Sequence, residues 1–288
     1  MRSLYVMEFG QWQGSGAPTA RRLQAGASRL AQLVPAAERQ VVELENSVGE
    51  RCGGVQNAAV LAHQLNSARA AVRSAPEDAL LLMLGGDCSV ELAAVEAASR
   101  TYGENMAVVW FDAHADLNSP ETSPSGAFHG MVLRSLTGEG PAELRPAAPL
   151  HPRSVVLAGT RSVDPGEQEF IERHGVPRLS VHELDDPASL VSAVRAAGAK
   201  TVYIHIDLDV LDPAVFPAVG SPEPSGLSAD SLLSAVRALT DEFRLAGLGI
   251  TEYERPDHLK EDEALLRGLI DGIVQSAQRT DTHGYGTT

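Results

Sequence analysis

The chain has 288 residues, of which 43% are apolar and 21% are charged, a balance typical of a globular protein. The 38 Asp and Glu residues outnumber the 23 Lys and Arg residues, so the formal net charge is -15. This negative charge argues against nucleic acid or an anionic membrane as the main partner, and no apolar run has the length of a membrane span.

The first ten residues, MRSLYVMEFG, are too short and too acidic a segment for a signal peptide. The two cysteines, Cys52 and Cys88, are too few for a disulfide framework. We therefore expect a cytoplasmic protein, because reducing compartments keep thiols free. Cys52 has no assigned role, and we expect a small buried thiol there.

Short apolar segments alternate with longer amphipathic segments rich in Ala and Leu. In chain order, the apolar segments predict strands at residues 4–9, 40–44, 79–84, 107–111, 154–158, 178–181, 201–206 and 244–250. The amphipathic segments predict helices at 19–34, 55–74, 90–102, 165–174, 187–197, 229–240 and 260–277. Ser228 suits the N-cap of one helix, and Pro165 and Pro187 suit the first turns of two others.

This alternation predicts an α/β fold with a mostly parallel sheet and helices on both faces. No linker-like segment or internal repeat interrupts it, so we expect a single domain over residues 1–288. Irregular segments at 113–128, 209–227 and 251–259 follow directly from strands, and ligands bind at such strand ends in open α/β sheets. We expect the segment at 138–153 to be a surface connection.

Two clusters of acidic residues follow predicted strands. One strand runs into Asp112, His114 and Asp116, and another runs into Asp207 and Asp209. Alternate side chains of an extended chain face the same way, so each cluster can converge on one point. Because carboxylates in one cleft repel one another unless a cation is present, the clusters predict a metal centre. Oxygen ligands with one imidazole suit Mn²⁺ better than Zn²⁺, and the acids are numerous enough to bridge two ions.

Three motifs resemble the ureohydrolases, the family of arginase, agmatinase and their relatives. They are GGDCS at 85–89, WFDAHADLN at 110–118 and IDLDVLDP at 206–213, and the resemblance extends from about residue 54 to the C-terminal helix. It implies a single three-layer α/β/α domain with an eight-stranded parallel sheet. It also implies hydrolysis of the guanidino C–N bond of a small molecule by a dinuclear manganese centre, in a homo-oligomer that is a trimer or a hexamer.

The resemblance implies two Mn²⁺ positions that share Asp112 and Asp207. Each position has two further ligands, namely Cys88 and Asp116 at one, and His114 and Asp209 at the other. The family normally has His where this chain has Cys88, and thiolate is a soft ligand for the hard Mn²⁺ ion. We therefore expect weak or partial occupancy of that position.

The resemblance also assigns catalytic residues. His129 matches the family's proton-shuttle histidine, Glu252 matches the carboxylate that holds the guanidinium group, and Ser221 matches a hydroxyl of the same pocket. Asp116 would accept a hydrogen bond from the attacking hydroxide. The alternative for His129 and for Glu252 is an ordinary solvated side chain.

Asn118 and Ser125 match positions that bind the substrate α-carboxylate in arginases, and both side chains can donate hydrogen bonds. Asp164 matches an acid near the α-amino group, although Ser162 stands where a further acid is usual. These residues favour an α-amino acid over agmatine, which lacks the carboxylate. The alternative is that Asn118 and Ser125 only shape their loop.

The identity of residue 88 bears on the substrate. A weakened metal position activates water less well, which favours a guanidine less basic than that of arginine. We therefore expect Nω-hydroxy-L-arginine, which would yield hydroxyurea and L-ornithine. The pattern is similar to the Nω-hydroxy-L-arginine amidinohydrolases of D-cycloserine biosynthesis, which also have Cys in place of this His.

Other interpretations remain open. The substrate could be arginine, agmatine, guanidinobutyrate or formiminoglutamate, with Cys88 a tolerated change in an ordinary arginase. Outside enzymes, the chain could be a metal-defective binding or regulatory homologue. Strand-end aspartates can also simply turn the chain, as we expect of Asp212 before Pro213. His205 shares a strand face with Asp207 but lies deeper, so we expect a core histidine there.

Overall fold

The computed structural model describes residues 2–34, 38–255 and 261–279. Within these residues, eight strands form one sheet in the order β2-β1-β3-β8-β7-β4-β5-β6, and all neighbours are parallel. The strands are β1 (Leu4–Phe9), β2 (Glu38–Val41), β3 (Leu80–Gly85), β4 (Met106–Phe111), β5 (Val155–Ala158), β6 (Arg178–Leu179), β7 (Thr201–Asp207) and β8 (Arg244–Thr251). The parallel sheet expected from the sequence is confirmed.

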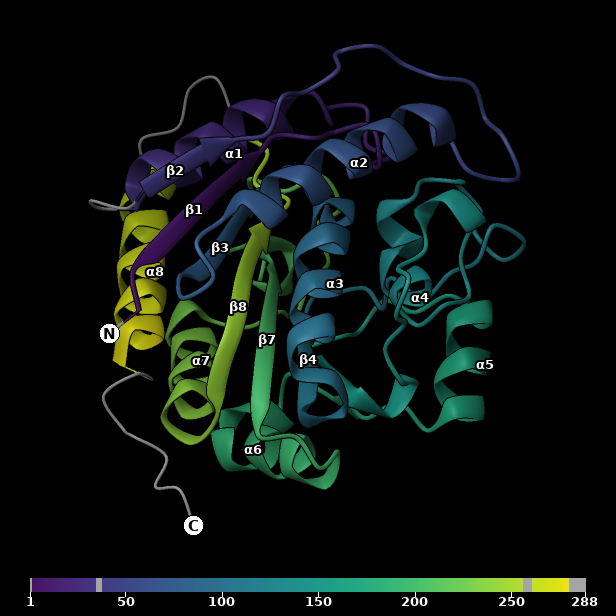
Figure 1. Ribbon diagram of the computed structural model, residues 1–288. Helices are drawn as coiled ribbons and strands as arrows, with labels where there is room; N and C mark the ends of the chain where they lie inside the picture. The colour runs from purple at the N-terminus through teal and green to yellow at the C-terminus, as the bar shows by residue number, and fades with distance from the viewer. Residues whose placement is uncertain (1, 35–37, 256–260, 280–288) are drawn as a thin grey trace.

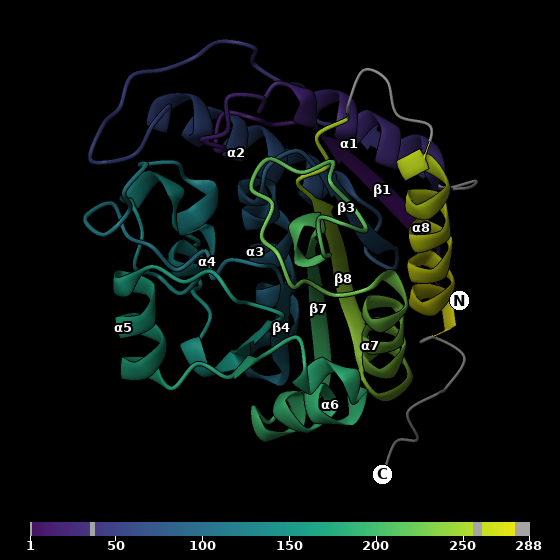
Figure 2. The ribbon, with the colours of Figure 1, turned by 180° about the vertical axis from the view of Figure 1, so that it is seen from behind.

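Helices cover both faces of the sheet, as Figures 1 and 2 show from opposite sides. One face carries α1 (Arg22–Leu33), α6 (Pro187–Ala196), α7 (Ala229–Glu242) and α8 (Glu261–Arg279). The other carries α2 (Ala58–Ser74), α3 (Glu91–Tyr102), α4 (Val132–Leu136) and α5 (Pro165–His174). A large apolar cluster fills the space under each helix layer, so the domain has the three α/β/α layers that were expected. None of the described helices combines the length and the hydropathy needed to cross a bilayer.

Strand β4 illustrates why the central strands are apolar throughout. Val109 and Phe111 pack into the cluster under α6 and α7, whereas Val108 and Trp110 pack into the cluster under α2 and α3. Successive side chains of a strand point to opposite faces, so a strand covered on both sides needs apolar residues at every position. Each fully buried side chain of this size stabilises the fold by about 1.5–3 kcal/mol.

The register of the central strands aligns their carboxyl ends. Phe111 of β4 pairs with Ile206 of β7, and Ile206 pairs in turn with Ile250 of β8. Ile250 also pairs with Leu84 of β3. The residues that follow these four strands therefore meet at one edge of the sheet, although they come from distant parts of the chain.

Some boundaries differ from the predicted ones. Strand β2 covers Glu38–Val41 rather than 40–44, because pairing with β1 sets its register and its exposed edge position tolerates polar residues. Helix α4 is too short to show a helical period, so the sequence does not predict it. The predicted start of the last helix, Lys260, lies outside the described residues.

Cys52 is exposed, so the expectation of a buried thiol is wrong. The residue lies in the irregular segment between β2 and α2, where its backbone forms a short bridge with Val55. Cys52 N donates to Val55 O at 2.9 Å, and Val55 N donates to Cys52 O at 3.0 Å. Val55 belongs to the apolar cluster on the α2 and α3 face, whereas Cys52 points out of it, so the thiol is not covered.

Candidate functional site

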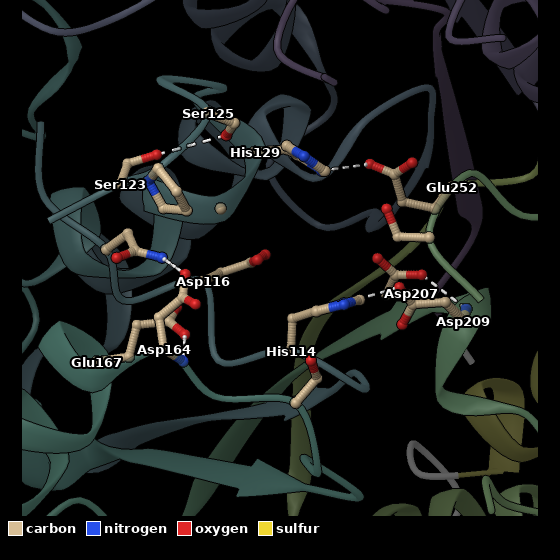
Figure 3. Close-up of a pocket in the computed structure, with 15 residues that line it drawn as sticks. His114, Asp116, Ser123, Ser125, His129, Asp164, Glu167, Asp207, Asp209 and Glu252 are labelled. Carbon is tan, nitrogen blue, oxygen red and sulfur yellow. Dashed lines mark hydrogen bonds and ion pairs between the residues drawn. The ribbon is translucent and has the colours of Figure 1, made fainter. Parts of the chain in front are cut away.

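A pocket opens at the carboxyl edge of the sheet (Figure 3). It is lined by most of the residues that the sequence assigns to the site, namely His114, Asp116, Asn118, Ser125, His129, Asp164, Asp207, Asp209, Ser221 and Glu252. Cys88 and Asp112 are buried and do not line it, but they contact residues that do. The structure therefore brings both predicted acidic clusters to a single cavity.

One group of potential ligands, termed the His114 cluster, consists of Asp112, His114 and Asp209, whose ligand atoms lie within 4.8 Å of one another. His114 Nδ1 lies 3.0 Å from Asp209 Oδ2 and 3.4 Å from Asp112 Oδ1. Ala113 N donates to Asp209 Oδ1 at 3.0 Å, which ties the loop after β4 to the loop after β7. Burial lowers the pKa of His114, but the bonds to Asp112 and Asp209 outweigh it and raise the pKa well above its ordinary value.

A second group, termed the Cys88 cluster, consists of Cys88, Asp207 and Glu252, again with ligand atoms within 4.8 Å of one another. Cys88 Sγ donates to Asp207 Oδ2 at 3.1 Å, and Cys88 N donates to Glu252 Oε1 at 3.2 Å. Burial raises the pKa of the Cys88 thiol well above its ordinary value, and the Asp207 carboxylate adds to this rise. A thiolate at this position therefore requires a cation to neutralise it.

Asp116 tests whether these residues suit a cation. The side chain is buried, and its Oδ2 has no hydrogen-bond partner within the described residues. Burial and then the Asp112 carboxylate raise the pKa of Asp116 well above its ordinary value, while burial and Asp209 do the same for Asp207. Leaving a buried polar atom unsatisfied costs about 1–3 kcal/mol, and more for a charged group. A divalent cation would bind this oxygen and offset the repulsion between the neighbouring carboxylates, so the donor set fits such an ion.

Asp116 and Glu252 share an uncommon backbone conformation. Their φ angles are 53° and 62°, in the left-handed region that favours glycine. Hydrogen bonds to distant segments hold both residues in place. Asp116 O accepts from Leu133 N at 3.1 Å, and Glu252 N donates to Gly86 O at 2.8 Å. Strain of this kind often accompanies functional positions.

His129 and Glu252 form a pair at the side of the pocket (Figure 3). His129 Nδ1 lies 3.2 Å from Glu252 Oε1, and the His129 side chain remains partly exposed to the cavity. Burial lowers the pKa of His129, but the hydrogen bond with Glu252 outweighs it and places the pKa above its ordinary value. The imidazole can therefore hold a proton near neutral pH, as a general acid must.

The residues predicted to bind the head of an amino acid lie together at another side of the pocket. Asn118 Nδ2 donates to Asp164 Oδ2 at 2.8 Å, which leaves the second amide hydrogen for another acceptor. Ser125 Oγ accepts from Ala127 N at 3.1 Å, a bond that also shapes its loop. Ser221 lines the same cavity.

Glu167 and Glu223 belong to the site, although the sequence pattern assigns them no role. Glu223 Oε1 lies 3.8 Å from His114 Nε2. Glu167 lines the pocket and accepts from Leu117 N at 2.9 Å and from Asp164 N at 2.8 Å. The spacing of Asp164 and Glu167 is that of a capping box, which could have signalled a helix start but not a pocket residue.

Replacing Glu167 by glutamine is expected to remove part of the pH dependence of stability. Burial raises the pKa of Glu167 from 4.5 to about 7. The protonated carboxyl therefore stabilises the fold fully below pH 4.5, and this contribution is lost as the pH rises through 7. The shift corresponds to about 3 kcal/mol. The free energy of unfolding can be measured by urea denaturation between about pH 4 and 8.5 with a chelator present. Over this range it should fall in wild type by up to this amount relative to Glu167→Gln.

The matched control is Glu172→Gln, which changes an exposed carboxylate on the same helix. This variant should keep the pH profile of wild type. A stability difference between wild type and Glu167→Gln that does not vary with pH would contradict the assigned protonation.

The site is a buried group of acids, thiol and imidazole beside a His–Glu pair, at the carboxyl edge of a parallel sheet. This arrangement suits a metal-dependent hydrolase. Comparison with known proteins narrows the class. Residues 16–266 match the sequence profile of the Arginase family. The chain is 34% identical to the arginase of Staphylococcus aureus over 203 residues, which cover 66% of this chain and 67% of the relative. The chain therefore belongs to the arginase family, whose members are amidinohydrolases acting on C–N bonds.

Solved structures agree with this assignment. The arginase of Bacillus caldovelox superposes with a TM-score of 0.80 at 26% identity, over 95% of this chain and 98% of that one. The arginase of Entamoeba histolytica, solved in complex with L-ornithine, superposes with a TM-score of 0.82 at 22% identity, over 96% of this chain and 99% of that one. Because its identity is only 22%, the superposition on the Entamoeba histolytica enzyme is evidence for the fold alone.

Proposed function

We propose that the protein is a manganese-dependent amidinohydrolase that hydrolyses Nω-hydroxy-L-arginine to hydroxyurea and L-ornithine. Water adds its oxygen to the guanidino carbon, the bond from that carbon to the δ-nitrogen breaks, and the δ-nitrogen gains a proton. The observation that carries the proposal is a pocket that combines a cluster of potential metal ligands with His129 and Glu252, and that has a thiol at residue 88.

The residues that would hold the metal are the aspartates and His114, with Cys88 as a weak ligand, while Glu252 is left for the substrate. The aspartates are Asp112, Asp116, Asp207 and Asp209. Asp112 and Asp207, both buried, are proposed to serve both metal positions, as the family resemblance implies. Divalent cations bound there would supply Lewis acidity and a nucleophilic water at neutral pH. Oxygen donors dominate the set, which favours Mn²⁺ at the His114 cluster.

Glu252 and His129 are proposed to act on the guanidino group. The Glu252 carboxylate reaches the pocket and complements a cationic guanidinium. Asp116 Oδ2, which has no partner within the described residues, can accept a hydrogen bond from the attacking water. His129 holds a proton beside the cavity and can deliver it to the departing δ-nitrogen, for which general acids contribute about 10²–10⁴-fold.

Asn118, Ser125 and Asp164 are proposed to select an α-amino acid. An amide hydrogen of Asn118 can bind the α-carboxylate, and Asp164 can bind the α-ammonium group. Agmatine offers no carboxylate to these donors. Ser221 is proposed as a further hydroxyl contact in the same cavity.

Cys88 is the reason to prefer the N-hydroxy substrate. The soft thiol in place of the family's imidazole weakens Mn²⁺ binding at this position, and so weakens the activation of water for attack on a strongly basic guanidine. An N-hydroxyguanidine is less basic, so its carbon is more easily attacked. On the same ground we propose that the protein serves antibiotic biosynthesis.

Kinetics with two substrates test the proposal. The value of kcat/KM for Nω-hydroxy-L-arginine should exceed that for L-arginine by at least about 10-fold, or about 1.4 kcal/mol of transition-state stabilisation. Ornithine release, which both reactions share, gives a common readout. Faster hydrolysis of arginine would show an ordinary arginase, an alternative that the curated arginase relatives favour.

Absence of any guanidine hydrolysis by the Mn²⁺-loaded protein would instead support a binding or regulatory homologue.

We also propose that the enzyme acts in the cytoplasm as a trimer or a hexamer on a small guanidino substrate. Sedimentation velocity checks the oligomeric state.

A further inference from the structure

His205 of β7 is fully buried and has no role in the proposed function. The ring stacks on Trp110 with a centroid separation of 3.5 Å and an interplanar angle of 19°. A histidine buried among apolar side chains is expected to bond both ring nitrogens or to serve as a ligand. The surroundings of its two nitrogens distinguish these cases.

The Nε2 side of the ring faces the metal centre. His205 Nε2 lies 3.7 Å from Cys88 Sγ, and Cys88, Asp112 and His205 offer ligand atoms within 4.8 Å of one another. Sulfur and nitrogen ligands at bond lengths of about 2.3 and 2.1 Å stand about 3.6 Å apart around a tetrahedral ion. Cys88 and His205, which form a sulfur–nitrogen hydrogen bond here, are thus also separated as two ligands of one ion are.

The Nδ1 side of the ring faces a buried acid. His205 Nδ1 lies 3.8 Å from Glu91 Oε1 of α3, and neither atom has a hydrogen-bond partner within the described residues. Glu91 Oε2 accepts from Tyr203 OH at 2.6 Å. Metal-bound histidines commonly donate their second N–H to a carboxylate, and Glu91 Oε1 is the acid oxygen that faces this nitrogen, 0.3 Å beyond the 3.5 Å limit of a hydrogen bond.

Gly249 of β8 makes room for this acid. A Cβ atom at residue 249 would lie 1.5 Å from Glu91 Oε1, so any larger residue there would displace the carboxylate. Glu91 is fully buried, and burying an acid whose oxygens are not all hydrogen-bonded costs free energy. The strand, the helix and the glycine together hold a carboxylate against His205.

We propose that His205, through Nε2, is a ligand of the metal position at Cys88, and that Glu91 is a positioning residue that orients its ring. This inference rests on the metal centre of the proposed function. The imidazole that the family supplies from residue 88 is then supplied from β7. The resulting thiolate, imidazole and carboxylate donors favour Zn²⁺ or Co²⁺ over Mn²⁺, so this position holds a softer ion than the His114 cluster does.

A Co²⁺ titration of the metal-free full chain tests the assignment. Coordination by Cys88 gives a thiolate-to-cobalt absorption band, and Cys52→Ser, which removes the exposed thiol, should leave that band unchanged. His205→Asn should weaken the Co²⁺ affinity read from this band by at least about 100-fold, and Glu91→Gln should weaken it by about 10–100-fold. His63→Asn, which removes an exposed imidazole, is the matched control and should bind as wild type does.

A second measurement uses wild type alone, in case a variant does not fold. In the proton NMR spectrum of the Co²⁺-loaded protein, each ligating imidazole gives one exchangeable, strongly shifted N–H signal. Signals from both His114 and His205 are expected. A single such signal, or a cobalt affinity of His205→Asn within twofold of wild type, would overturn the proposal. Neither readout involves guanidine hydrolysis, so a failure of the proposed activity is recognised separately.

Discussion

Asp207→Asn is expected to lower kcat by at least about 10³-fold, equivalent to about 4 kcal/mol of transition-state stabilisation. Asp207 bonds to Cys88 and is the acid proposed to bridge the two metal positions. An amide cannot supply the charge that a bridging carboxylate supplies. Metal content, measured by elemental analysis after dialysis, should fall together with the activity.

The fold should tolerate this change. The side-chain oxygen of asparagine can still accept from Asp209 N, as Asp207 Oδ1 does at 2.7 Å. Burial and Asp209 raise the pKa of Asp207, so a neutral side chain relieves repulsion in the metal-free protein, whose Tm should not decrease. Asp212→Asn is the matched control, because Asp212 lies in the same motif but bonds to Ala214 N at 2.8 Å in a turn. Full activity and full metal content in Asp207→Asn would refute the dinuclear site.

His129→Ala is expected to lower kcat by about 10²–10⁴-fold while changing KM little. The imidazole is proposed to deliver a proton to the leaving nitrogen, and Glu252, at 3.2 Å, keeps it protonated. Steady-state kinetics with Nω-hydroxy-L-arginine and with L-arginine separate the two parameters.

The control for this variant is His182→Ala, since the His182 side chain is 97% exposed. It should behave as wild type. An unchanged kcat in His129→Ala would exclude the proton-transfer role, and a rise in KM alone would indicate that His129 only binds substrate.

Much of the fold follows from local patterns. Apolar strands such as β4 are recognisable because they are covered on both faces. Ser228 accepts from Ser231 N at 3.0 Å, and Pro165 and Pro187 lie in first turns, as their positions predict. Sequence patterns do not predict the bounds of the edge strand β2 or the short helix α4, because pairing with β1 and tertiary contacts determine where these elements form.

The site could be predicted only in part. Asp112 and His114 are two residues apart after β4, so alternation predicts their meeting, whereas the left-handed backbone that aims Asp116 into the pocket could not be predicted. The environment of His205 could not be predicted, because Cys88 reaches it from the turn after β3 and Glu91 reaches it from α3. Its burial agrees with the expectation of a core histidine, but that expectation does not include the neighbouring thiol.

The left-handed backbone at Asp116 and Glu252 has an implication for protein engineering. Glycine would relax either residue by about 1–2 kcal/mol but would delete its carboxylate. Selection for heat resistance alone would therefore enrich variants with these two acids removed. Directed evolution of this protein therefore needs a screen for turnover as well as one for thermal stability, because the substitutions that raise stability most easily are at residues proposed to take part in the reaction.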